Sequence, residues 1–272
     1  MGKGKNNEEL FRSMPVAQAI LTLAVPTVVS QIITIIYNMA DTFFIGQLGD
    51  PKQVAAATLA MPLFMFMTAL SNLFGVGGAS LISRFLGGGE REKASRCGAF
   101  CIWTAAAVAV LYGLMVLAGR PVLLPVLGAN EETCDMASSY LFWTIGLGAL
   151  PTVMNPALAH LIRSEGYSRQ ASFGVAFGGI LNMALDPLFI YGLHLQITGA
   201  AVATLISNAA AMIYFLTFIW KIRGVSVLTL SPGMYTLGEH IPAEVISVGM
   251  PSFLISMMGT VSNMVLNHII AG

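Results

Sequence analysis

Residues 13–40 read SMPVAQAILTLAVPTVVSQIITIIYNMA and contain no charged side chain. A helix needs about 20 mainly apolar residues to cross the hydrocarbon core of a bilayer, so this stretch is long enough to span one. Five further long apolar stretches follow, and Asp186 and a turn near Gly192 divide one of them. The sequence therefore predicts seven spanning helices, within about 13–40, 53–83, 97–119, 136–162, 170–192, 197–221 and 245–272.

The overall composition also indicates a membrane protein. Apolar residues make up 56% of the chain and charged residues only 10%, whereas a soluble domain carries about 25% charged residues. The net charge is zero, so no basic field favours nucleic acid. Three scattered cysteines give neither a disulfide scaffold nor a zinc site, and the four histidines form no catalytic pattern. We expect no enzyme activity and no cofactor.

The distribution of basic residues predicts the orientation. With the N-terminus in the cytoplasm, two of the thirteen basic residues, Lys52 and Arg120, fall outside. The other eleven fall inside, as the positive-inside rule requires: Lys3, Lys5, Arg12, Arg84, Arg91, Lys93, Arg96, Arg163, Arg169, Lys221 and Arg223. We expect a multi-pass protein of the inner (plasma) membrane with a cytoplasmic N-terminus.

A weak internal repeat suggests that the last helix begins a second lobe. A shift of 225 residues places Pro251 on Pro26 and Asn263 on Asn38. Each proline interrupts an apolar helix and could act as a hinge, although a static packing kink is equally consistent. We expect a cytoplasmic N-terminus (1–13), a six-helix transmembrane lobe (14–223), a cytoplasmic linker (224–241) and the first helix of a truncated C-terminal lobe (242–272).

Two acidic residues remain inside the predicted spans, Asp41 late in the first and Asp186 late in the fifth. An ionised aspartate at the centre of a membrane helix costs about 2.5–3.5 kcal/mol, so each needs a partner, water or a proton. If both face one cavity, they could share a proton or hold a sodium ion. The alternative is that each is hydrated at a helix end, among lipid headgroups.

Two polar residues could complete a cation site with these acids. Asn182 precedes Asp186 by four residues, which places both side chains on one face of the helix. Thr204 on the next helix offers a hydroxyl oxygen, and hard cations prefer oxygen ligands. Taken alone, Asn182 is better explained by an interhelical hydrogen bond, and Thr204 by a bond to its own backbone.

Several of these motifs together resemble a known family. The chain is similar to the multidrug and toxic compound extrusion (MATE) transporters, and most similar to their DinF-like branch. The motifs that carry the resemblance are Pro26-Thr27, YNMADTFFIG at 37–46, the turn at 87–94, RSEG at 163–166, NMALDPLFI at 182–190 and GAAVAT at 199–204.

The resemblance implies a fold of twelve helices in two six-helix lobes. It also implies export of cationic or amphipathic compounds in exchange for H⁺ or Na⁺. Asp41, Asn182, Asp186 and Thr204 match the cation-coupling positions of that branch. Tyr37, Asn38 and Asn155 match substrate-cavity positions, and Pro26 matches a proline proposed to bend on protonation.

The implied mechanism is that substrate binds while Asp41 and Asp186 are ionised. A proton or sodium ion that enters from outside then neutralises the two acids, and the substrate is expelled. The chain reaches only one helix into the second lobe, so we expect residues 1–272 alone not to export. Alternative functions are a lipid-linked saccharide flippase, for which a more cationic cavity is expected, and a non-transporting membrane subunit, which would not explain paired acids.

Overall fold

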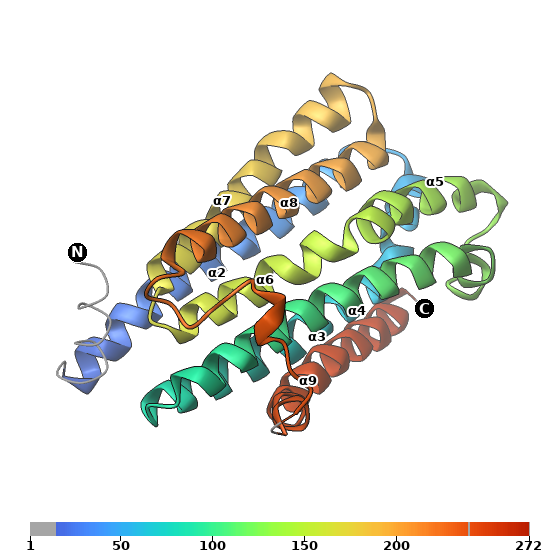
Figure 1. The fold of residues 1–272 in the computed structure, drawn as a ribbon. Helices are drawn as coiled ribbons and strands as arrows, with labels where there is room; N and C mark the ends of the chain where they lie inside the picture. Colours follow the sequence, from blue (N-terminus) through green and yellow to red (C-terminus); the bar gives the residue numbers. More distant parts are fainter. Residues whose placement is uncertain (1–14, 239, 272) are drawn as a thin grey trace.

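The computed structural model describes the backbone of residues 15–238 and 240–271, and the side chains of 15, 17, 18, 20–238 and 240–259. Within these residues the fold consists of helices joined by short turns, with no strand (Figure 1). The long helices are α2 (Val16–Gly46), α3 (Pro51–Gly87), α4 (Arg91–Val126), α5 (Glu131–Leu141), α6 (Ala149–Ser164), α7 (Ser168–Pro187), α8 (Gln196–Ile222) and α9 (Ile241–Ala271). Two π-helical turns, η1 (Phe142–Leu147) and η2 (Leu188–Gly192), and a 3₁₀ turn, η3 (Pro232–Met234), complete the order.

Six helices of the described chain are long and apolar enough to cross a membrane. A seventh span results if α5, η1 and α6 are counted together, although that unit is bent by 47°. The predicted all-helical, polytopic fold is therefore confirmed. The observed helices begin and end within about seven residues of the expected spans. The fourth span, which the sequence predicted as one continuous stretch over 136–162, is instead bent.

The bend in the fourth span has a local cause in the sequence. Pro151 lies in the first turn of α6 and cannot donate a backbone hydrogen bond to the preceding turn. A side chain at Gly148 would collide with the carbonyl group of Thr144, so this segment requires glycine. Gly113 of α4 lies against the π segment, where an added Cβ would be 2.9 Å from the carbonyl oxygen of Ile145. The two glycines and the proline together allow a bent, tightly packed crossing.

Helix α9 packs along α3 through small residues. An added Cβ at Gly77 of α3 would lie 2.6 Å from the carbonyl oxygen of Val245, and Gly249 lies against the backbone of Leu73. Asn72 also donates a hydrogen bond to Ser256 Oγ at 2.9 Å. Such close approach is typical of helix pairs in membranes, where packing and interhelical hydrogen bonds replace the hydrophobic effect.

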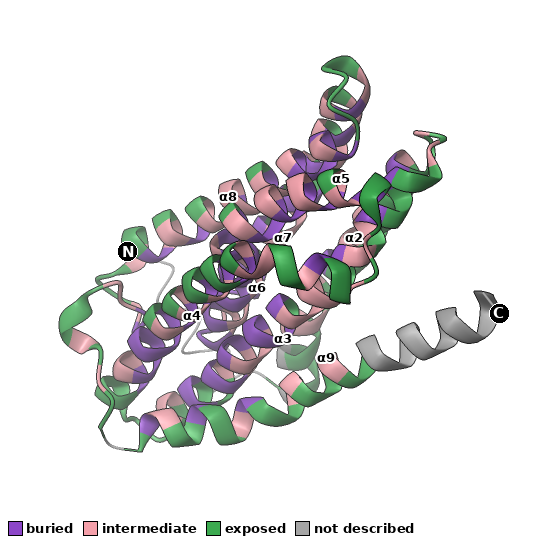
Figure 2. Ribbon diagram, turned by 90° about the vertical axis from the view of Figure 1, so that its right-hand side faces the viewer, coloured by how far each residue is buried: buried purple, intermediate pink, exposed green. Residues whose placement is uncertain are grey.

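The buried side chains gather on the facing sides of α3, α4 and α6, whereas much of α2 and α9 is exposed (Figure 2). Apolar side chains dominate the exposed faces; Ile255 of α9, for example, is 71% exposed. In a membrane protein these faces lie against lipid or other apolar protein surface. Helix α2 packs mainly on α7, which in turn packs on α8.

The two repeat prolines, Pro26 and Pro251, both lie inside long helices, α2 and α9. The repeat position Asn263 has no described side chain, and the predicted cytoplasmic segment 1–13 lies outside the described residues. The expected lobe and linker boundaries stay predictions.

Candidate cation and ligand site

A cavity of about 650 Å³ opens between α2, α3, α6, α7 and α8. Its lining includes six of the eight residues that the sequence singled out: Tyr37, Asn38, Asp41, Asn155, Asn182 and Thr204. Asp186 lies directly behind Asn182, and Pro26 is not among the lining residues. The candidate site is thus built from helices that are distant in sequence.

Asp41 and Asp186 lie near each other inside the bundle. Asp186 is fully buried, and its Oδ1 accepts a hydrogen bond of 3.2 Å from Asn182 Nδ2. Asp41 and Tyr140 both line the cavity, as does Asn182. Within the described chain, neither Asp41 Oδ1 nor Asp186 Oδ2 has a hydrogen-bond partner. Two buried carboxylate oxygens therefore remain available for a proton or a cation.

Asn182 joins Asp186 to Thr204 of α8. Its Nδ2 lies 3.4 Å from Thr204 Oγ1 as well as 3.2 Å from Asp186. Asn182 is buried, as expected for a residue that shares a helix face with Asp186. Two carboxylates, an amide and a hydroxyl thus form a compact set of oxygen donors, which suits a hard cation or a shared proton.

Asn155 belongs to a second polar contact, beside the first. Its Nδ2 donates to Asn208 Oδ1 at 2.8 Å, and Asn208 donates to the carbonyl oxygen of Thr204 at 3.0 Å. Neither Asn208 nor Tyr140 was predicted from the sequence. The spacing of four residues between Thr204 and Asn208 places both on one face of α8, and this signal could have identified Asn208.

Tyr37 lies against the backbone of α7. An added Cβ at Gly179 would be 2.7 Å from Tyr37 Cδ1, so the missing side chain allows the ring to approach. This close contact holds α2 beside the helix that carries Asn182 and Asp186. Helices α2 and α7 therefore form one packed unit across the acid pair.

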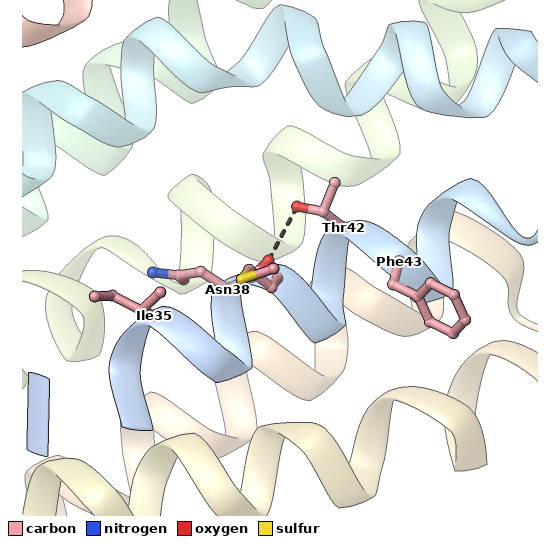
Figure 3. Close-up of a pocket in the computed structure, with 5 residues that line it drawn as sticks. Ile35, Asn38, Thr42 and Phe43 are labelled. Atoms are coloured by element: carbon pink, nitrogen blue, oxygen red, sulfur yellow. Dashed lines mark hydrogen bonds between the residues drawn. The ribbon is translucent and has the colours of Figure 1, made fainter. Parts of the chain in front are cut away.

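Asn38 lies at the edge of the cavity. It lines the inner cavity and also a shallow groove on the outer face of α2, together with Ile35, Met39, Thr42 and Phe43. Figure 3 shows this groove, in which the Thr42 hydroxyl donates to the carbonyl oxygen of Asn38 at 3.0 Å. Asn38 is exposed, so it can contact a ligand from either side.

Two basic residues, His160 and Arg163, also line the cavity. From the sequence, Arg163 was expected to follow the fourth helix as a cytoplasmic charge. In the structure it lies in the last turn of α6, because this helix extends to Ser164. The periodicity of a single helix does not reveal which charged residue faces a cavity across the bundle.

Comparison with known proteins found one matching family and several related sequences. The sequence profile of the family described as MatE matches residues 26–188. A multidrug export protein MepA from Staphylococcus saprophyticus is 32% identical over 96% of the chain, and a MepA from Staphylococcus aureus is 30% identical over the same share. In both cases the chain spans 57% of the length of the relative.

Solved transporter structures have a similar arrangement of helices. A MOP superfamily transporter from Pyrococcus furiosus superposes with a TM-score of 0.86 at 27% identity, over 96% of this chain and 57% of that one. A structure of MATE in complex with MaL6 superposes with a TM-score of 0.90 at 27% identity, over 99% and 58%. The helical arrangement thus matches somewhat more than half of each transporter structure.

Proposed function

Because the chain belongs to the MatE family, we propose that it forms the ion-coupled lobe of a secondary antiporter that exports cationic or amphipathic drugs in exchange for H⁺ or Na⁺. The chain is a multi-pass membrane protein by its apolar helices and its relatives. The curated relatives are multidrug export proteins, which supports a role in transport.

One observation carries the proposal: two carboxylate groups lie at one cavity inside a bundle of membrane helices, Asp41 in its lining and Asp186 behind Asn182. One oxygen of each has no hydrogen-bond partner in the described chain. Repulsion between the charges and their removal from water both disfavour two ionised acids. Binding a proton or a sodium ion relieves both costs. A cationic substrate does the same, so ion and substrate should compete.

Coupling then follows from differential affinity. A cationic substrate binds more tightly when Asp41 and Asp186 are charged, and binding of the ion lowers that affinity. Asn182 and Thr204 would help to hold the ion through their oxygen atoms, whereas Tyr37, Asn38 and Asn155 would contact the substrate in the cavity. Pro26 lies outside the cavity lining, so its proposed role is that of a hinge in α2.

We place the N-terminus in the cytoplasm and the protein in the inner membrane. The excess of basic residues at one end of the helices supports this orientation. In this arrangement Asp41 and Asp186 lie toward the outer half of the bilayer. Protons or sodium ions from outside would therefore reach the acids more directly than ions from the cytoplasm.

Equilibrium binding of ethidium, a fluorescent lipophilic cation, tests the proposal on the purified chain in lipid nanodiscs. Binding is measured at acidic and alkaline pH, and with sodium or choline chloride at equal ionic strength. We expect protons or sodium to weaken binding to the wild type. Asp41→Asn should bind about tenfold more weakly, because a charge-assisted contact is lost, and should no longer respond to the ions.

Asp135→Asn is the matched control, because Asp135 is exposed on α5 and lies outside the cavity. It should bind ethidium as the wild type does. The proposal fails if the wild type is insensitive to both ions, or if Asp41→Asn keeps the same ion-dependent binding.

A further inference from the structure

The cavity carries opposite charges at its two ends. Among the described residues that line it, Asp41 and Arg163 carry opposite charges at neutral pH, and His160 offers an imidazole hydrogen-bond donor. His160 and Arg163 are three residues apart on α6, a spacing that puts both on the same side of the helix. The two basic side chains therefore form one group, separate from the acid pair.

The separation follows from helix geometry. Arg163 Nη2 lies 3.4 Å from Ser30 Oγ on α2, which fixes the level of the guanidinium along that helix. Ser30 and Asp41 are eleven residues apart, close to three full turns, so they lie on one face of α2 about 16 Å apart. Thr34 and Tyr37, which line the cavity, lie on this face between them. The basic and acidic ends are thus far enough apart to act on different parts of one ligand.

Arg163 has no anionic partner within the described residues. The ion pairs found there are Lys52–Glu132, Lys93–Glu90 and Arg96–Glu92. Arg163 Nε is buried without a hydrogen-bond acceptor in the same part of the chain, and the contact with Ser30 is long. A guanidinium keeps its charge in proteins, and a charged group inside a membrane protein normally faces a paired group or a polar cavity. An anionic group of a ligand would supply the acceptor that the protein lacks.

We propose that His160 and Arg163 form an anion subsite, which binds the carboxylate or phosphate group of an amphipathic ligand whose cationic end lies at Asp41. This rests on the proposed function and narrows its substrate class to amphipathic zwitterions. Arginine suits the role because its planar donors bind such anions in pairs. Met61, Phe64 and Met65 also line the cavity and provide an adaptable apolar surface for the middle of the ligand.

Competition against ethidium tests the subsite with three ligands of equal chain length. ω-Aminododecanoic acid has a positive and a negative end, its methyl ester lacks the negative end, and dodecylamine is a simple cation. In phosphatidylcholine nanodiscs we expect the wild type to bind the acid about tenfold more tightly than the ester, the effect of one charge-assisted contact. Equal binding of acid and ester to the wild type would overturn the subsite without involving any variant.

Arg163→Gln should remove the preference for the acid, measured as the ratio of acid to ester affinity, and Arg163→Lys should keep part of this ratio. Arg169→Gln, at an exposed position in the first turn of α7, should retain the full preference. A preference that survives Arg163→Gln would contradict the assignment. If added phosphatidylglycerol abolishes the preference in the wild type alone, the subsite binds an anionic lipid headgroup. Failure of the ethidium and Asp41→Asn experiment would instead refute the proposed function.

Discussion

Gly179 determines how closely α7 approaches α2 beside the acid pair. The Tyr37 ring occupies the space that a side chain at this position would need, with 2.7 Å between an added Cβ and Tyr37 Cδ1. A methyl group would have to displace either the ring or the helix. The arrangement of Asp41 relative to Asp186 therefore depends on the absence of one side chain.

Gly179→Ala should lower the stability of the folded chain by about 1–3 kcal/mol, the usual cost of overpacking. It should also weaken the ion dependence of ethidium binding, because α2 is displaced from α7. Thermal unfolding in nanodiscs and the binding assay measure the two effects. Gly46→Ala is the control, since an added Cβ at this end of α2 meets nothing within 4 Å. Wild-type stability and binding in Gly179→Ala would rule out this role for the contact.

Among single residues, the sequence identified those whose chemistry is unusual for a membrane span. Charge inside an apolar stretch identified Asp41 and Asp186, and spacing along one helix added Asn182. Tyr140 and Asn208 were missed, because tyrosine and asparagine are ordinary in such helices until another helix brings a partner. Arg163 was assigned to a loop because it lies near the end of its apolar stretch. Only the assembled bundle shows that it lines a cavity.

Among the helices, the segment after α8 is held to the end of α6 by a buried carboxylate. Glu165 is only 7% exposed, and its oxygen atoms accept hydrogen bonds from Ser226 Oγ at 2.6 Å and from the backbone N–H groups of Val227 and Leu228 at 2.6 and 3.0 Å. Arg91 of α4 donates to the carbonyl oxygen of Val225 at 2.7 Å. Three helices thus meet at the segment that leads to α9.

Burial raises the pKa of Glu165 above its usual value, although the hydrogen bonds from Ser226, Leu228 and Val227 and the charge of Arg91 act in the opposite direction. Between the unfolded and folded pKa values, the folded chain therefore binds a proton that the unfolded chain has already released. The free energy of unfolding should fall as pH rises through this window, and should be highest below it.

Glu165→Gln should flatten this part of the pH profile, because glutamine is neutral throughout and its carbonyl oxygen can still accept from the backbone. Thermal unfolding as a function of pH measures the difference between wild type and variant. Glu131→Gln, at an exposed position in the first turn of α5, should keep the wild-type slope. An unchanged slope in Glu165→Gln would show that this carboxyl does not titrate with folding.

Apolar length and turn residues were sufficient to predict the number and order of the spans. Gly89, with a φ of 80°, lies in the predicted turn between α3 and α4, and the break after η2 lies where the sequence divides the fifth and sixth helices. The bend inside the fourth span was not predicted. Hydropathy measures the length of an apolar stretch and carries no information about a π turn, which depends on how Leu117 of α4 packs against Gly146.

For the whole molecule, the described chain has six candidate spans, or seven if the bent unit of α5, η1 and α6 is counted, and the last of them, α9, packs along α3. The chain covers 57% of the length of its curated relatives. Ligand binding requires only the cavity within the first six spans, whereas alternating access requires two lobes that move relative to each other. Binding and ion coupling are therefore the properties that residues 1–272 can test directly.

If the acid pair binds either the coupling ion or the cationic substrate, as we propose, binding of the substrate must release the ion. Ethidium is added to the chain in weakly buffered solution, while a pH indicator and a sodium electrode record ions released. We predict that the wild type releases protons or sodium as ethidium binds, and that the Asp41→Asn, Asp186→Asn double variant releases neither. Ethidium binding to the wild type without release of either ion would contradict the account.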